Sequence, residues 1–170
     1  MHMRRRRGQA IVEFALVVTA FLFLLLAGTQ LIWWTVAQAE LRMALDTSLE
    51  QAGAGAEAEY QSHFSNPLCT PNPTTYSDSQ LGSMLGGTVS NAQNDATQLM
   101  RSLPGGSSST GGVSAQIAET EQGDVILEIS GFYQLPTFFS IPGILPDPLP
   151  VLAVAQRHLD LAGMRKGTSC

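Results

Sequence analysis

The apolar positions of this chain separate one long hydrophobic segment from a mixed remainder. Residues 14–39 carry no charged side chain, an uninterrupted run of 26 residues. At about 1.5 Å per helical residue this run reaches about 39 Å, which is enough to cross a hydrocarbon core about 30 Å thick. Since a backbone in lipid must satisfy its own hydrogen bonds, the pattern predicts a transmembrane helix over residues 9–38. Trp33 and Trp34, near its end, are typical of the aromatic belt at a membrane surface.

Beyond the hydrophobic run the pattern stays helical but becomes amphipathic. From Leu41 to Ala52, apolar residues recur at steps of three and four, with charged residues on the other faces. This spacing predicts a helical stem over residues 39–55 that continues the membrane helix. Gly53 and Gly55 each disfavour a helix by about 1 kcal/mol relative to alanine, so the stem is expected to weaken there.

The remaining residues, 56–170, are expected to form a small extracytoplasmic head. Prolines, glycines and short polar residues give residues 60–87 the composition of a loop. A second amphipathic helix is predicted over residues 89–103, with Thr88 or Ser90 as its N-terminal cap.

After the second helix the period changes from helical to two, which is typical of strands. Alternating apolar residues predict strands over residues 113–119 and 124–133, joined as a hairpin, and a third strand over residues 150–158 that returns to it. The chain is therefore expected to have an α+β fold: a long membrane helix and stem, a second helix, and a short antiparallel sheet of about three strands. Residues 132–149 are rich in proline and large apolar side chains. This composition fits either core that covers the sheet or an exposed surface that binds a partner.

Charge is distributed unevenly along the chain and sets its expected orientation. The hydrophobic run is preceded by a basic leader that contains Arg4, Arg5, Arg6 and Arg7. Downstream of Gly8, by contrast, five basic residues face fourteen acidic ones. By the positive-inside rule, the N-terminus is expected in the cytoplasm and the head outside, with a single crossing of the inner (cytoplasmic) membrane. An acidic body without a basic stripe argues against binding of nucleic acid.

The start of the hydrophobic run carries a recognisable motif, GQAIVEFALV from Gly8 onward. It resembles the leader of the TadE-like minor pilins and pseudopilins of the tight-adherence (Flp-type) pilus, over roughly residues 4–40. The resemblance implies that a prepilin peptidase cuts between Gly8 and Gln9 and removes the basic leader, residues 1–8. It also implies a role in pairing with other subunits for Glu13, the fifth residue of the mature chain, and for its neighbour Phe14.

A carboxylate at the position of Glu13 needs an explanation, because an ionised side chain within an apolar segment is costly. The resemblance implies that Glu13 pairs with the new α-amino group on Gln9 of a neighbouring subunit. The alternative is that Glu13 lies shallow enough to be hydrated near the lipid headgroups. The matching spacing of Gly8 and Phe14 favours pairing.

The only two cysteines, Cys69 and Cys170, both fall on the outer side of the membrane by the charge rule. An oxidising compartment would allow them to form a disulfide that ties the C-terminus to the loop around Cys69. Because Cys170 is the last residue given, pairing between subunits and a free thiol remain alternatives.

No residue set in the sequence predicts catalysis or a cofactor. His63 and His158 lack neighbours at the spacing of a metal site, and no nucleophile motif or paired carboxylates stand out. We therefore expect a protein that is not an enzyme, has no small-molecule substrate, and takes part in the assembly or structure of a Tad-type pilus. Its expected partners are the prepilin peptidase, other pilins and pilus assembly proteins, and the lipid bilayer. The alternative is an unprocessed, single-pass binding module tethered to the cell envelope.

Overall fold

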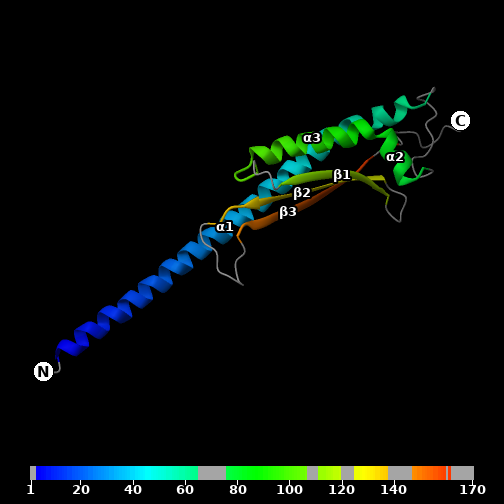
Figure 1. Cartoon of the computed structure of the whole chain (residues 1–170). Coiled ribbons are helices and arrows are strands. Elements are labelled where there is room, and N and C mark those ends of the chain that lie inside the picture. The colour runs from blue at the N-terminus through cyan, green and yellow to red at the C-terminus, as the bar shows by residue number, and fades with distance from the viewer. Residues whose placement is uncertain are drawn as a thin grey trace.

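The computed structural model describes residues 3–64, 76–106, 111–119, 125–137, 147–159 and 161, with side chains from Gln9 onward. One long helix projects from a head made of two further helices and a sheet (Figure 1). This arrangement confirms the predicted α+β fold with a long N-terminal helix and a three-stranded antiparallel sheet. The elements, in chain order, are α1 (Met3–Ser62), α2 (Asp78–Met84), α3 (Gly86–Ser102), β1 (Gly112–Glu119), β2 (Val125–Leu135) and β3 (Leu149–His158).

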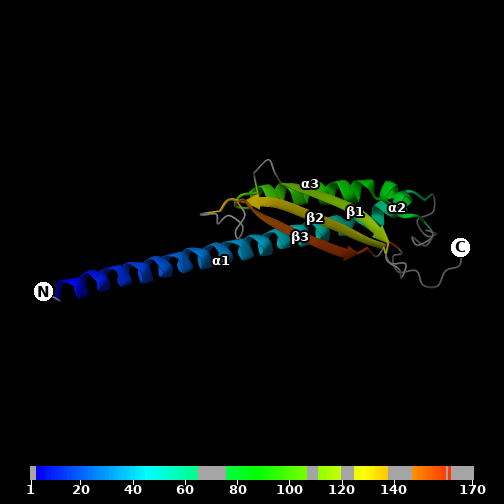
Figure 2. The same cartoon turned by 60° about the horizontal axis from the view of Figure 1, so that its bottom comes forward.

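Helix α1 has 60 residues and is therefore about 90 Å long. Its first half stands clear of the rest of the molecule, and its second half runs along the head (Figures 1 and 2). The division follows the sequence pattern, because the second half is amphipathic and buries one stripe of side chains from Ala37 to Tyr60. The other buried apolar members of that stripe are Leu41, Ala44, Leu45, Leu49, Ala52 and Ala56.

Helix α1 continues past Gly53 and Gly55, where the stem was expected to weaken, without a break to Ser62. Burial of Ala56 and Tyr60 beyond the glycines offsets their low helix propensity. Gly53 also has a packing role. A Cβ placed there would lie 3.1 Å from Nε of Arg157 on β3, so the missing side chain leaves room for Arg157 to lie close against α1.

The sheet has the order β1-β2-β3, and both strand pairs are antiparallel. Along β2, alternate side chains face the helices and are buried, as the period of two predicts. In the central register Ile129 lies opposite Ala115 of β1 and Ala155 of β3. At Gly131 the sheet approaches α1 closely, because a Cβ there would lie 3.3 Å from Leu45. Helices α1 and α3 thus cover the buried face, and Leu45 and its neighbours form the core between the layers.

Two expectations for the segment between α1 and the sheet need correction. Residues 60–87 are not a single loop, because α1 extends into this range and α2 occupies part of it. At the start of α2 the backbone N–H of Ser77 donates to Oε1 of Gln80 at 3.0 Å, one half of a capping box. Helix α3 begins at Gly86, three residues earlier than predicted, and Leu85 stands at its N-cap in place of Thr88 or Ser90.

Residues 132–137 contribute side chains both to the core and to the surface. Tyr133 and Leu135 of β2 are buried, whereas the side chain of Phe132 is 49% exposed on the outer face of the sheet. Residues 138–146 lie outside the described residues. Pro150 lies in β3, an edge strand of this sheet, where a missing backbone N–H is tolerated.

Tyr60 gives the head a measurable dependence on alkaline pH. Its ring packs edge-on against Phe64, with centroids 5.2 Å apart, and lies near Tyr76. Burial, with a further contribution from Tyr76, raises the pKa of Tyr60 from 10.0 to about 12. Since the folded pKa lies above the unfolded value, the associated stability is fully present below pH 10.0 and is lost as the pH rises to about 12.

We therefore expect the free energy of unfolding, measured by denaturant titration in detergent, to fall between pH 10.0 and about 12. Tyr60→Phe should make this fall shallower. Burial and the nearby Glu40 also raise the pKa of Tyr133, so part of the fall should remain. An identical pH profile in wild type and Tyr60→Phe would contradict the assignment.

Candidate functional site in the N-terminal helix

The first half of α1 presents apolar side chains on all sides. Within the described residues, one helix is long and apolar enough to cross a membrane, and its most apolar stretch is not buried against the rest of the molecule. Such a surface is unfavourable in water and requires lipid or other apolar helices around it. Its most exposed large side chains are Ile11, Phe14, Leu16, Val17, Leu24 and Ile32.

Gln9 and Glu13 are brought together one helical turn apart near the start of this apolar surface. The side-chain amide of Gln9 donates a hydrogen bond from Nε2 to Oε1 of Glu13 at 2.9 Å. Both side chains are exposed, so the rest of the molecule shields neither of them. Phe14 follows directly and is 71% exposed, which leaves its ring free to contact a neighbouring molecule.

The predicted cleavage bond between Gly8 and Gln9 lies within the helical backbone of α1. A protease that binds an extended substrate must unwind the helix there, and glycine lowers the cost of unwinding by about 1 kcal/mol relative to alanine.

The basic leader is helical as well, because α1 begins at Met3. For its four arginines, Arg4, Arg5, Arg6 and Arg7, the structure gives the backbone only. Their expected role as the leader charge therefore stays a prediction from the sequence. The two residues of the predicted disulfide, Cys69 and Cys170, lie outside the described residues altogether.

The head begins where the apolar surface of α1 ends, and Trp34 fixes this junction. Its indole N–H donates from Nε1 to the backbone oxygen of Pro150 at 3.0 Å, which joins α1 to the start of β3. The hydroxyl of Tyr133 lies 3.5 Å from the backbone oxygen of Ala37, one turn further along α1. Trp33, by contrast, is 44% exposed. The sequence predicted a role in the aromatic belt for both tryptophans. Only Trp34 packs against the core of the head, where it extends the buried stripe of α1 toward the apolar half of the helix.

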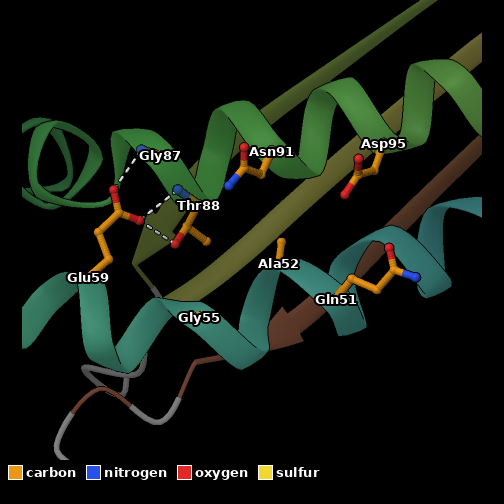
Figure 3. Close-up of a pocket in the computed structure, with 8 residues that line it drawn as sticks. All are labelled: Gln51, Ala52, Gly55, Glu59, Gly87, Thr88, Asn91 and Asp95. Carbon is orange, nitrogen blue, oxygen red and sulfur yellow. Dashed lines mark hydrogen bonds between the residues drawn. The ribbon is translucent and has the colours of Figure 1, made fainter.

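A second connection, at the far end of the head, joins α1 to α3 through Glu59 (Figure 3). Its Oε1 accepts a hydrogen bond from the backbone N–H of Gly87 at 2.7 Å, and its Oε2 accepts one from the backbone N–H of Thr88 at 2.6 Å. The hydroxyl of Thr88 also donates to Oε2. A carboxylate from α1 therefore satisfies N–H groups that α3 cannot satisfy itself. Sequence reasoning missed this cap because the two helices are far apart along the chain.

Two open grooves flank α1 in the head, and neither carries an evident catalytic arrangement. The first, of about 480 Å³, lies between α1 and α3 beside the Glu59 cap (Figure 3). The second, of about 450 Å³, runs between α1 and the edge strand β3 and is lined by Arg42, Leu152 and Val154 among others. In the part of the chain that the structure describes, no three His, Cys, Asp or Glu side chains gather to hold a metal ion.

Comparison with known proteins agrees with the geometry of α1. Residues 8–48 match the model of the family described as TadE-like protein. No curated protein and no solved structure matches the chain. The matched segment starts at Gly8, contains Gln9 and Glu13, and runs through the apolar half of α1 into the part that carries the head. The resemblance seen in the sequence is thereby confirmed: over residues 8–48 the chain is similar to the TadE-like family.

Proposed function

We propose that this protein is a minor pilin or pseudopilin that takes part in the assembly or structure of a Tad-type pilus. The observation that carries the proposal is the exposed apolar half of α1, with Glu13 five residues after Gly8 and a folded head on the same helix. The role is structural: the helix anchors the subunit and packs with other pilins, and the head lies outside the cytoplasm.

Processing is the first step of the proposed function. The prepilin peptidase cuts between Gly8 and Gln9 at the cytoplasmic membrane surface, where the four leader arginines are attracted to anionic headgroups. The cut leaves the apolar helix attached to the head and creates a positively charged α-amino group on Gln9. This charge lies about one helical turn from Glu13, which is near enough to serve a neighbouring subunit that is displaced along the helix axis.

The dimensions of α1 suit a single crossing with the head against the outer membrane surface. A hydrocarbon core of about 30 Å takes up about 20 helical residues, so a helix entering near Gln9 leaves near Thr29. Gln30 is the first residue along the described side chains of α1 to be buried, with 4% of its surface exposed. Trp33 and Trp34 follow, at the depth where aromatic side chains favour the headgroup region. The contact of Trp34 with Pro150 then holds the start of β3 at this level.

In this proposal, assembly depends on an ion pair between Glu13 and a cation of a neighbouring subunit. An isolated carboxylate in the bilayer is costly, and the α-amino group of a neighbouring Gln9 removes that cost only when two subunits pack side by side. The exposed Phe14 and the apolar residues that follow supply the contact between helices. If two neighbouring helices are shifted along their axes by the wrong distance, Glu13 of one cannot reach the amine of the other. The ion pair therefore also selects one axial offset between subunits.

Glu13→Ala is expected to insert and be processed normally but to abolish or strongly reduce piliation. Removing the charge should ease insertion, by at most about 2.5–3.5 kcal/mol at the bilayer centre and by less at this depth. The measurement is the number of pili per cell, together with the amount of processed subunit in the membrane. Glu50→Ala, an exposed carboxylate on the same helix beside the head, is the matched control and should leave piliation unchanged. Normal piliation with Glu13→Ala would favour hydration of Glu13 near the headgroups over pairing.

A further inference from the structure

The hydrogen bond between Gln9 and Glu13 has a chemical consequence once Gln9 becomes the first residue. An N-terminal glutamine is unstable, because its unprotonated α-amine can attack Cδ of its own side chain. A C–N bond forms, the bond from Cδ to Nε2 breaks, and Nε2 leaves as ammonia with the proton given up by the α-amine. The product is a five-membered lactam that carries no positive charge and has lost the mass of one ammonia.

The geometry of α1 works against this ring closure. Closure requires the side-chain carboxamide of Gln9 to fold back onto the α-nitrogen of the same residue. In the structure the carboxamide extends along the helix, where its Nε2 donates to Oε1 of Glu13 at 2.9 Å. A side chain held in that direction keeps Cδ away from the α-nitrogen. The bond must therefore break before the ring can close.

The charge of Glu13 strengthens this restraint. Both side chains are exposed at the start of the apolar surface, beside Ile11 and Phe14, which are themselves more than half exposed. Water can reach the pair at the membrane surface, but a hydrogen bond to an ionised group is about twice as strong as one between neutral groups.

We propose that Gln9 is a site of self-modification in the mature protein and that Glu13 protects it by holding its carboxamide away from the α-amine. The proposal rests on the proposed cleavage after Gly8, because Gln9 has a free α-amine only in the cut chain. Glu13 then acts in two stages. Before assembly it keeps its own chain's N-terminus an amine, and in the assembled fibre it binds the amine of a neighbour.

The consequence for assembly is specific. A subunit whose Gln9 has cyclised offers no cation to a neighbour's Glu13, although its helix and head are intact. Loss of Glu13 therefore damages two things: the carboxylate that receives an amine and the amine that the same chain supplies. Subunits stored in the membrane for longer lose more of their amines when Glu13 is absent.

Intact-mass measurement over time tests the proposal. Wild type and Glu13→Ala are made in two ways: by processing in cells that carry the peptidase, and with residues 1–8 replaced by a tag that a site-specific protease removes directly before Gln9. Both are reconstituted in vesicles of phosphatidylethanolamine and phosphatidylglycerol and incubated at neutral pH. We expect the species lighter by one ammonia to form about fivefold faster in Glu13→Ala, the ratio that corresponds to a net hydrogen bond of about 1 kcal/mol, because exposure to water lowers the value for a bond to a charged group.

Two further variants separate the hydrogen bond from other effects. Glu13→Gln retains an oxygen that accepts from Nε2 but loses the charge, so its rate should lie between those of wild type and Glu13→Ala. Val12→Ala truncates a neighbouring exposed side chain and should behave as wild type.

Equal rates in wild type and Glu13→Ala would overturn the proposal, as would a wild-type chain that is fully cyclised when isolated from cells. A Glu13→Gln rate equal to that of Glu13→Ala would also overturn it, because the charge and not the hydrogen bond would then protect Gln9. An uncut wild-type chain in peptidase-bearing cells would sink the proposed function instead. The protease-released chain still measures the effect of Glu13 in that case.

Discussion

Gly8→Val is expected to leave the chain uncut in the membrane. In the structure the bond between Gly8 and Gln9 is helical, so the peptidase must first unwind this turn. Valine adds a branched side chain next to the bond to be cut and removes the conformational freedom that eases unwinding. The expected effect is near-complete loss of processing, since the side chain stands directly before the cleaved bond.

N-terminal sequencing and intact mass of the membrane-bound protein measure the effect. Wild type should begin at Gln9 and Gly8→Val at its original terminus. Gly28→Val is the matched control: it places the same side chain on the apolar part of α1, where a Cβ meets nothing within 4 Å, and should be processed normally. A wild-type protein that keeps Met1 in cells with the peptidase would contradict the pilin proposal. It would favour an unprocessed binding module tethered to the envelope.

Glu59→Ala is expected to destabilise the head by about 2 kcal/mol. The substitution removes an ionised acceptor for two backbone N–H groups and one hydroxyl at the start of α3. Hydrogen bonds to charged groups contribute about 1.5–3 kcal/mol, and a negative charge at a helix N-terminus adds about 0.3–1 kcal/mol, while partial exposure reduces both. The free energy of unfolding in detergent, from denaturant titration followed by circular dichroism, is the measurement. Glu50→Ala, exposed on the same helix, should change it little.

Two adjacent glycines provide an independent test of the same cap. A Cβ on Gly87 would lie 2.6 Å from Oε1 of Glu59, whereas a Cβ on Gly86 meets nothing within 4 Å. Gly87→Ala should therefore displace the carboxylate and destabilise the head. Gly86→Ala should be neutral or stabilise by up to about 1 kcal/mol, because alanine favours a helix. Equal stability of the two variants would show that Glu59 does not hold α3 in place.

Local periodicity was sufficient for most of the fold. The apolar run and the steps from Leu41 to Ala52 predicted a membrane helix that continues into the head, and the alternation around Ile129 predicted an antiparallel sheet. These signals work because a helix or strand repeats the same environment every few residues. Helix α2 was missed even though Ser77 and Gln80 have the spacing of a capping box, because the prolines upstream dominated the composition of that segment.

The contacts that position the elements could not be predicted from the sequence, because each joins residues far apart along the chain. Trp34 reaches Pro150, Glu59 reaches Gly87, and Arg157 lies against Gly53. Each partner has an ordinary local explanation: an interfacial tryptophan, a solvated carboxylate, a helix-weakening glycine. Only the packing of the helices and strands shows that Trp34, Glu59 and Gly53 instead make contacts between distant elements. The motif from Gly8 to Phe14 could be recognised in the sequence because it is a contiguous stretch, and it lies in the segment that matches the TadE-like family.

Helix α1 runs unbroken from Gln9 to Ser62, so the height of the head along the helix axis and its rotation about that axis are coupled. Each residue of an α-helix advances by about 1.5 Å and turns by about 100°. The number of residues between Glu13 and Trp34 therefore sets both the distance of the head from Glu13 along the axis and the direction in which the head faces around it. No hinge lies between these two residues to absorb a change in either. If Glu13 fixes the axial stagger of neighbouring helices, as proposed, the same unbroken helix would also fix which side of each head faces outward from the fibre.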